Sequence, residues 1–154
     1  MHALALELDT VLADTRPLWQ DWLDDAARRT RVELGLPDDR IEAAAVLDEQ
    51  LGDWRPLLAR FAAERAPVYF RPHGDTGAVL RRLQTAGARL AVFTDAPTEL
   101  AGIALAHVGV ARRVEVVGTL EEVLAALGEG TTVVRSRDEL SAAASVYHAG
   151  HGAH

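Results

Sequence analysis

The sequence contains no cysteine, no lysine and no asparagine. Without cysteine there is no disulfide, no thiolate zinc site and no cysteine nucleophile. All 16 basic residues are therefore arginine, so any mechanism that needs a lysine amine is excluded. Together with the abundant alanine, these absences are typical of GC-rich coding rather than of a particular chemistry.

Long apolar runs and an excess of positive charge are missing as well. No apolar run approaches 18 residues, so none predicts a transmembrane helix. The first residues lack a basic region and reach Glu7 quickly, which is unlike a signal peptide. The net charge of −7 argues against binding to nucleic acid or to an anionic membrane surface. These features predict a cytoplasmic protein that binds neither.

The 154 residues fit one domain whose pattern alternates between strands and helices. Strands are predicted over residues 3–9, 89–95, 113–118 and 131–136. Helices are predicted over residues 17–34, 40–51, 54–66, 76–87, 97–110, 119–130 and 137–148. Residues 67–75, with two prolines, read as a linker, and Thr119 with Glu122 forms a capping-box pattern. The alternation predicts an α/β fold with a parallel sheet between two helical layers, a three-layer Rossmann-like arrangement.

Three helices separate the first two strands, which is too much chain for a single crossover. We therefore predict a core of residues 1–15 and 69–148 and a small helical cap, residues 16–68, inserted after the first strand. Trp19, Trp22 and Trp54 either build the small core of this cap or form a face for a partner. The segment 149–154 is expected to be a disordered tail, although His148, His151 and His154 have a spacing that could bind a metal.

Acidic and hydroxyl residues follow the first two predicted strands, where parallel sheets bind ligands. Glu7 and Asp9 end the first strand, and Thr94 and Asp95 end the second. On an extended strand, residues 7 and 9 point the same way and lie about 6–7 Å apart. One carboxylate can then attack or bind a metal while the other transfers protons, and the Thr94 hydroxyl can hold an anionic oxygen.

Two quoted segments carry a resemblance to a known family. "LELDTVLADT" is followed by the helical insertion, and "RPHGDTGAVLRRLQTAGARLAVFTDAP" follows it. This combination resembles the haloacid dehalogenase superfamily over residues 3–18 and 70–118. The resemblance implies a three-layer α/β core with a helical cap, and magnesium-dependent phosphatase activity. It also implies that position 7 holds the nucleophile, that Asp9 is the acid–base residue and that Thr94 holds the phosphoryl group.

The sequence departs from the pattern of this family at several positions. The nucleophile position holds Glu7, one methylene longer than aspartate, and the usual glycine is Thr10. The family's lysine cannot be present, and the loop that carries it is missing. Where the last acidic motif should bind the metal, the chain has Arg135 and Ser136. Phosphoryl transfer without these groups loses most of its charge stabilisation.

The altered motifs favour a domain that has lost phosphatase activity and has a binding, regulatory or structural role. We expect Arg135 or Arg137 to approach the acids in place of a cation, because adjacent carboxylates need compensation. Thr10, Thr94 and Asp95 are the expected anion-binding residues. No metal or other cofactor is expected. The partner would be an unknown protein or a small anionic ligand.

Two alternatives remain open. In an active hydrolase, Glu7 and Asp9 would still work, Arg112 or Arg113 would replace the lysine, and Mg²⁺ would bind Glu7, Asp9 and Asp138. In an interaction module, the cap helices would mediate self-association, giving a homodimer.

Overall fold

Four parallel strands form one sheet in the computed structural model, which describes residues 2–152, with side chains up to residue 146. The strands are β1 (Ala3–Glu7), β2 (Arg89–Phe93), β3 (Val117–Gly118) and β4 (Thr132–Val134), in the order β3-β2-β1-β4. Glu7 of β1 pairs with Phe93 of β2, and Leu6 pairs with Val134 of β4. The predicted α/β class with a parallel sheet is confirmed. Glu7 is the last residue of β1 and Thr94 follows β2, so both lie at the carboxyl edge of the sheet, on adjacent strands.

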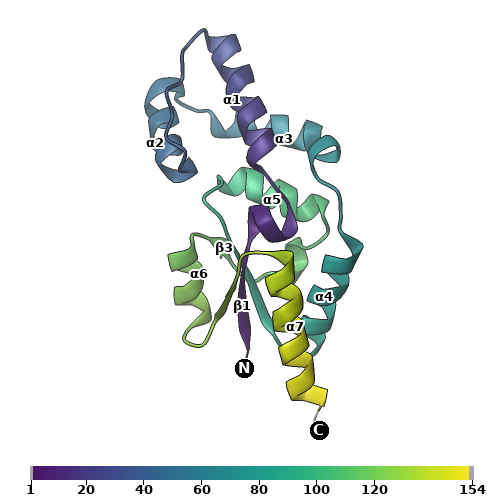
Figure 1. Ribbon diagram of the computed structural model, residues 1–154. Coiled ribbons are helices and arrows are strands. Elements are labelled where there is room, and N and C mark those ends of the chain that lie inside the picture. The colour runs from purple at the N-terminus through teal and green to yellow at the C-terminus, as the bar shows by residue number, and fades with distance from the viewer. Residues whose placement is uncertain (1, 153–154) are drawn as a thin grey trace.

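Helices cover both faces of the sheet (Figure 1). Because side chains alternate along a strand, Leu4 and Leu6 point to one face and Ala3 and Ala5 to the other. The leucine face packs against α4 (Gly74–Thr85), α5 (Thr98–His107) and α7 (Arg137–Gly152). The alanine face packs against α6 (Leu120–Leu127). The result is a three-layer arrangement with the sheet in the middle.

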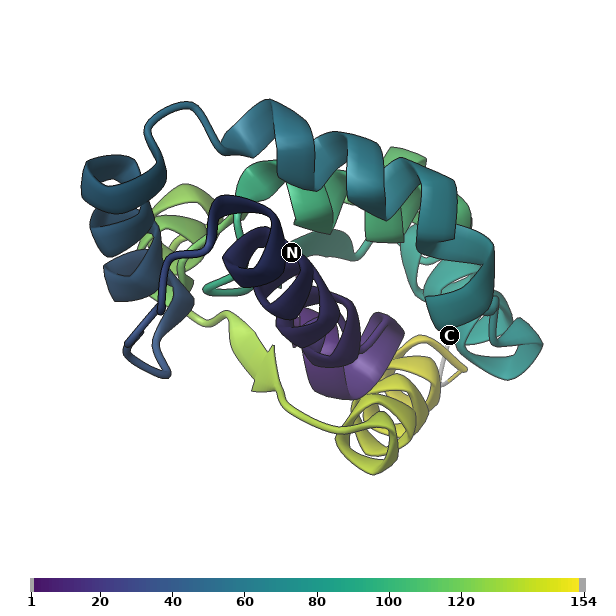
Figure 2. The same cartoon turned by 90° about the horizontal axis from the view of Figure 1, so that it is seen from above.

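Three helices between β1 and β2 lie above the carboxyl edge of the sheet (Figure 1). They are α1 (Arg16–Thr30), α2 (Arg40–Leu51) and α3 (Arg55–Tyr69). Trp19, Trp22 and Trp54 are at most 7% exposed, and their ring centroids lie 5.6–6.2 Å apart. The tryptophans therefore form the core of the cap rather than a surface for a partner. Seen from above, α3 runs along α5 at the rim of the molecule (Figure 2).

Some predicted boundaries were wrong. The expected linker from residue 67 begins with the last turn of α3, which contains Pro67 and ends at Tyr69. An interior proline lacks one helical hydrogen bond, but Phe70 N still donates to Ala66 O at 2.8 Å, and both residues are buried. The predicted strand 113–118 is reduced to β3, because a 3₁₀ turn occupies Ala111–Arg113.

In the C-terminal third of the chain, one prediction is confirmed and another is wrong. Thr119 and Glu122 form the predicted capping box at the start of α6. The last helix, α7, continues to Gly152, beyond the predicted end at residue 148, so the expected tail begins as helix; residues 153 and 154 lie outside the described residues. The candidate metal ligands His148, His151 and His154 likewise fall outside the described side chains. No described helix is long and apolar enough to span a membrane.

Candidate functional site

The first strand ends at Glu7, and a π-helical turn, η1 (Leu8–Leu12), follows at once. The expectation that Glu7 and Asp9 share one extended strand was therefore wrong. Leu8, Val11 and Leu12 of this turn are buried, so burial of the apolar residues curls the chain where the alternating pattern predicted a strand. The turn gives the two carboxylates separate sets of partners.

Glu7 is bound by an arginine from the neighbouring strand end. Nη1 of Arg135, which follows β4, lies 3.0 Å from Oε2 of Glu7. The Thr10 hydroxyl donates to Oε1 of Glu7 at 2.6 Å. The Arg135 guanidinium also lies 5.1 Å from the ring centroid of Phe93, within the range of a cation–π interaction. The expected approach of Arg135 to the acids is thus present, and Thr10 contacts Glu7 rather than facing an open anion site.

Asp9 is bound by groups at the start of the cap and within it. One carboxylate oxygen accepts from the backbone N–H of Thr15 at 2.8 Å and from its hydroxyl at 2.6 Å. The other oxygen accepts from the guanidinium of Arg40, the first residue of α2. Both oxygens of the expected acid–base residue therefore have donors from the protein itself.

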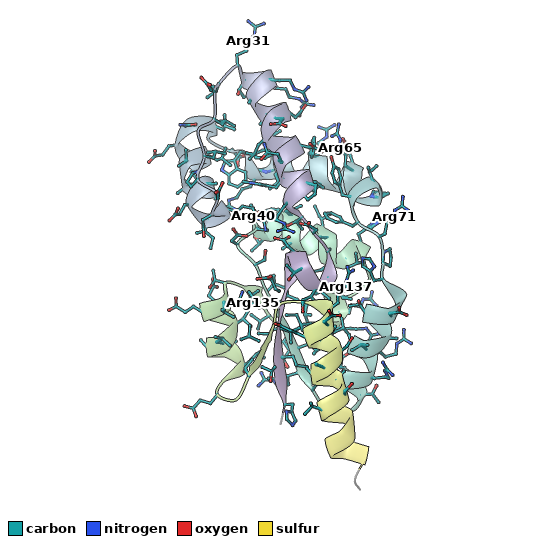
Figure 3. The ribbon with its side chains drawn as sticks, viewed as in Figure 1. Arg31, Arg40, Arg65, Arg71, Arg135 and Arg137 are labelled. Atoms are coloured by element: carbon teal, nitrogen blue, oxygen red, sulfur yellow. The ribbon has the colours of Figure 1, made fainter. Side chains whose placement is uncertain are left out.

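Arg40 also binds Asp95, which follows β2. Its Nε donates to Asp95 Oδ1 at 2.9 Å and its backbone N–H donates to Oδ2 at 3.0 Å. Its Nη1 donates to the Thr15 hydroxyl at 2.7 Å. The Arg40 side chain is only 4% exposed, and it lies between the cap and the core (Figure 3). We call these four residues, Arg40, Asp9, Asp95 and Thr15, the Arg40 junction.

The environment of Asp95 favours its ionised form. Partial burial opposes ionisation, but hydrogen bonds from the Arg40 backbone and guanidinium outweigh burial and lower the pKa of Asp95 below its ordinary value. The Asp95 side chain remains 36% exposed. Asp95 therefore forms an ion pair with the buried Arg40 guanidinium on one side and is exposed to water on the other.

The remaining predicted residues do not join one cluster. The Thr94 hydroxyl accepts from Ala96 N at 3.0 Å, within its own loop. Arg137 donates to the backbone carbonyl of Val11 at 3.2 Å rather than to an acid. Arg112 and Arg113 precede β3, at the amino edge of a parallel sheet. They lie at the opposite edge from the acids, so they cannot replace the family's lysine.

A magnesium ion does not fit the side chains at this edge. Arg135 pairs with Glu7, and Arg40 pairs with Asp9. Among the residues whose side chains are described, no three His, Asp or Glu side chains are grouped so that they could hold a metal ion, so the set of Glu7, Asp9 and Asp138 is not assembled. Two guanidinium groups therefore already bind carboxylate oxygens that a metal ion would need as ligands.

Arg40 is the functional residue that the sequence analysis missed. It follows Asp39, whose carboxylate caps α2 by accepting from the backbone N–H groups of residues 41 and 42. That pattern predicts a helix start but gives no reason for the next side chain to be buried. The sequence contained only an indirect indication. Several acids were predicted at one edge of the sheet, and in a chain without lysine only an arginine could neutralise them.

Two cavities of about 600 Å³ flank the Arg40 junction. One lies beside α1 and the segment before α2, and carries five carboxylates and two arginines: Asp9, Asp24, Glu33, Asp38, Asp95, Arg16 and Arg40. The other lies between α2 and the loops after β2 and β3, and carries four carboxylates and two arginines: Asp48, Asp95, Glu99, Glu122, Arg40 and Arg55. Both are net negative, so their electrostatic potential disfavours a small anionic ligand.

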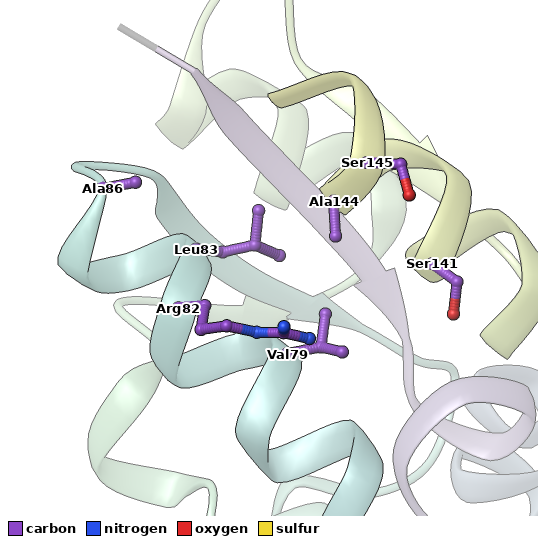
Figure 4. Close-up of a pocket in the computed structure, with 7 residues that line it drawn as sticks. All are labelled: Val79, Arg82, Leu83, Ala86, Ser141, Ala144 and Ser145. Carbon is purple, nitrogen blue, oxygen red and sulfur yellow. The ribbon is translucent and has the colours of Figure 1, made fainter. Parts of the chain in front are cut away.

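A smaller cavity of about 230 Å³ lies between α4 and α7, away from the acids (Figure 4). Val79, Leu83, Ala86 and Ala144 give it an apolar lining, with Arg82, Ser141 and Ser145 as its polar groups. It contains no carboxylate, so it does not extend the candidate site.

Comparison with known proteins adds no family to these observations. No protein-family model matches the chain, and no curated protein matches it significantly.

Proposed function

We propose that the protein is a haloacid dehalogenase-like domain that no longer hydrolyses phosphate esters and serves as a non-catalytic domain that binds another protein. One observation carries the proposal: the buried guanidinium of Arg40 bridges Asp9 and Asp95. In the resemblance, Asp9 is the acid–base residue. This carboxylate already accepts three hydrogen bonds, from the Thr15 N–H, the Thr15 hydroxyl and the Arg40 guanidinium, which leaves at most one acceptor position for a substrate.

The nucleophile position supports the same proposal. Glu7 is paired with Arg135 and with the Thr10 hydroxyl, so each of its carboxylate oxygens already accepts a hydrogen bond, which weakens it as a nucleophile. A shift of about 1 Å in a reacting group can cost ~100-fold in rate, and glutamate already displaces the carboxylate relative to aspartate. The absence of the family's lysine would remove about 3 kcal/mol more of transition-state stabilisation, by analogy with the loss of one stabilising donor.

A protein partner fits the charges better than a small anion does. Both cavities beside the Arg40 junction carry more carboxylates than arginines. A phosphate or carboxylate ligand would meet this negative surface without a free guanidinium from Arg40. We therefore infer that the Arg40 junction holds the cap on the core and that the protein partner binds the outer surface.

The test is hydrolysis of p-nitrophenyl phosphate with and without Mg²⁺. We expect the wild-type protein and Glu7→Asp to release no more product than buffer, because restoring the nucleophile supplies neither the cation nor the metal ligands. Glu49→Ala, at an exposed position of α2, is the control for nonspecific effects of losing a glutamate. Magnesium-dependent turnover by the wild-type protein that disappears in Glu7→Ala would overturn the proposal in favour of an active hydrolase.

A further inference from the structure

The outer side of α3 carries two exposed large apolar side chains, one near each end of the helix. Helix α3 packs against α5 and α1 with its buried residues, and its opposite side lies at the rim of the molecule (Figure 2). Leu57 and Val68 on that side are 59% and 74% exposed. They are two of the four large apolar side chains that are exposed among the residues with described side chains. The exposed residues of this side, the α3 face, are Pro56, Leu57, Arg60, Ala63, Glu64, Pro67 and Val68.

The side chains of the α3 face are arranged so that the face matches a second copy of itself running in the opposite direction. On a helix with 3.6 residues per turn, Leu57 and Val68 lie on one flank of the face, eleven positions apart. Pro56 and Pro67 lie on the other flank, also eleven positions apart. Both pairs are centred near residue 62, so reversing the helix exchanges the two apolar ends on each flank.

The charges follow the same symmetry. Arg60 and Glu64 lie in the middle of the α3 face, on either side of residue 62, and their side chains are 81% and 61% exposed. Within one chain they form an ion pair at 3.3 Å. When two α3 helices run antiparallel, Arg60 of each copy lies opposite Glu64 of the other. Ala63, also exposed near the centre, is small enough to let the two helices approach closely.

We propose that the α3 face binds a second copy of this chain and forms a two-fold symmetric dimer of antiparallel α3 helices. A two-fold interface uses the same patch on both subunits and must be self-complementary. The α3 face meets this requirement in its apolar ends and in its charges at once. The inference does not depend on the proposed function, because a working hydrolase could dimerise through the same face.

Charge reversal tests the geometry of the pairing. Wild-type protein is studied by sedimentation across a micromolar to submillimolar dilution series and should show a monomer–dimer equilibrium. In Arg60→Glu the central charges are all negative, and in Glu64→Arg they are all positive. Each variant alone should dimerise at least about tenfold more weakly, a loss of roughly 1.4 kcal/mol. An equimolar mixture of the two should recover the dimer, because each carries the complement of the other.

Apolar substitutions give a second measurement. Val68→Ser on the α3 face should weaken the dimer, because a two-fold interface loses the same side chain twice. Val146→Ser is the matched control: Val146 on α7 is 73% exposed, like Val68, but lies on another helix. It should leave the dimerisation constant unchanged, and circular dichroism checks that all variants fold. A wild-type protein that stays monomeric throughout the series would overturn the proposal. So would a mixture of the charge variants that sediments like each variant alone.

Discussion

Replacing Arg40 by methionine tests whether the Arg40 junction holds the cap on the core. Methionine fills part of the space of the arginine stem but removes the charge and the donors to Asp9 and Asp95. Removing one partner of a buried ion pair typically costs 3–5 kcal/mol, because it leaves a charge uncompensated. Asp95 is 36% exposed and can be rehydrated, so we expect a loss near the lower end, about 3 kcal/mol. That is a large share of a typical unfolding free energy of roughly 5–15 kcal/mol.

The assay is urea unfolding followed by far-ultraviolet circular dichroism. Arg29→Met is the control, because Arg29 forms a 3.1 Å ion pair with Asp25 while its side chain is 73% exposed. Exposed pairs of this kind contribute about 0.3–0.5 kcal/mol. A free energy of unfolding for Arg40→Met within about 0.5 kcal/mol of the wild-type value would refute the reasoning, since it would equal an exposed pair.

The pH dependence provides an independent check on the same variant. The pKa of Asp95 is lowered in the folded protein, so the stabilisation from its pairing is present above the unfolded-state pKa of about 3.9. It is lost as the pH falls through the lower folded-state pKa. The difference in unfolding free energy between wild type and Arg40→Met should therefore shrink as the pH falls below about 4. A difference that stays constant from neutral pH to pH 3 would contradict the assigned role of Asp95.

Two further predictions concern sites away from the junction. Thr119→Ala removes the side-chain acceptor of the α6 capping box and should lower the unfolding free energy by about 1 kcal/mol; Thr132→Ala, exposed on β4, is the control, and equal effects would contradict the assignment. The Tyr69 hydroxyl donates to Asp21, which raises the pKa of Tyr69; in a spectroscopic titration, Asp21→Asn should lower the pH at which this phenol ionises, and an unchanged titration would show that Asp21 is not the cause.

The sequence predicted the parts of the fold that depend on local periodicity. The alternation of apolar runs and amphipathic helices was enough to place the strands and the three-helix insertion. The expectation that Arg135 or Arg137 would approach the acids, made because adjacent carboxylates need compensation, agrees with the Arg135–Glu7 pair but not with the position of Arg137. The π-helical turn after Glu7 could not be read from "LALELDTVL", since a short apolar run does not distinguish a strand from a tight helical turn. Pro67 inside α3 was missed because burial of Ala66 and Phe70 outweighs the local effect of proline.

Arg40 was missed for a different reason. Its partners Asp9 and Asp95 lie 31 and 55 positions away in the sequence, and only the docking of α2 on the core brings them together. Local patterns contain no information about such docking. Composition did predict that arginine would compensate the acids, but it could not say which of the 16 arginines would do so.

The same sequence separations govern when the Arg40 junction forms during folding. Arg40 and Asp95 are 55 positions apart in the sequence, and closing a loop of that length costs entropy before the contact is gained. We therefore expect the junction to be a late contact, made after the sheet and the cap helices have formed. Late contacts oppose unfolding more than they accelerate folding. On this expectation Arg40 mainly slows unfolding, while the rate at which the molecule first folds depends more on the local helices and the apolar strands.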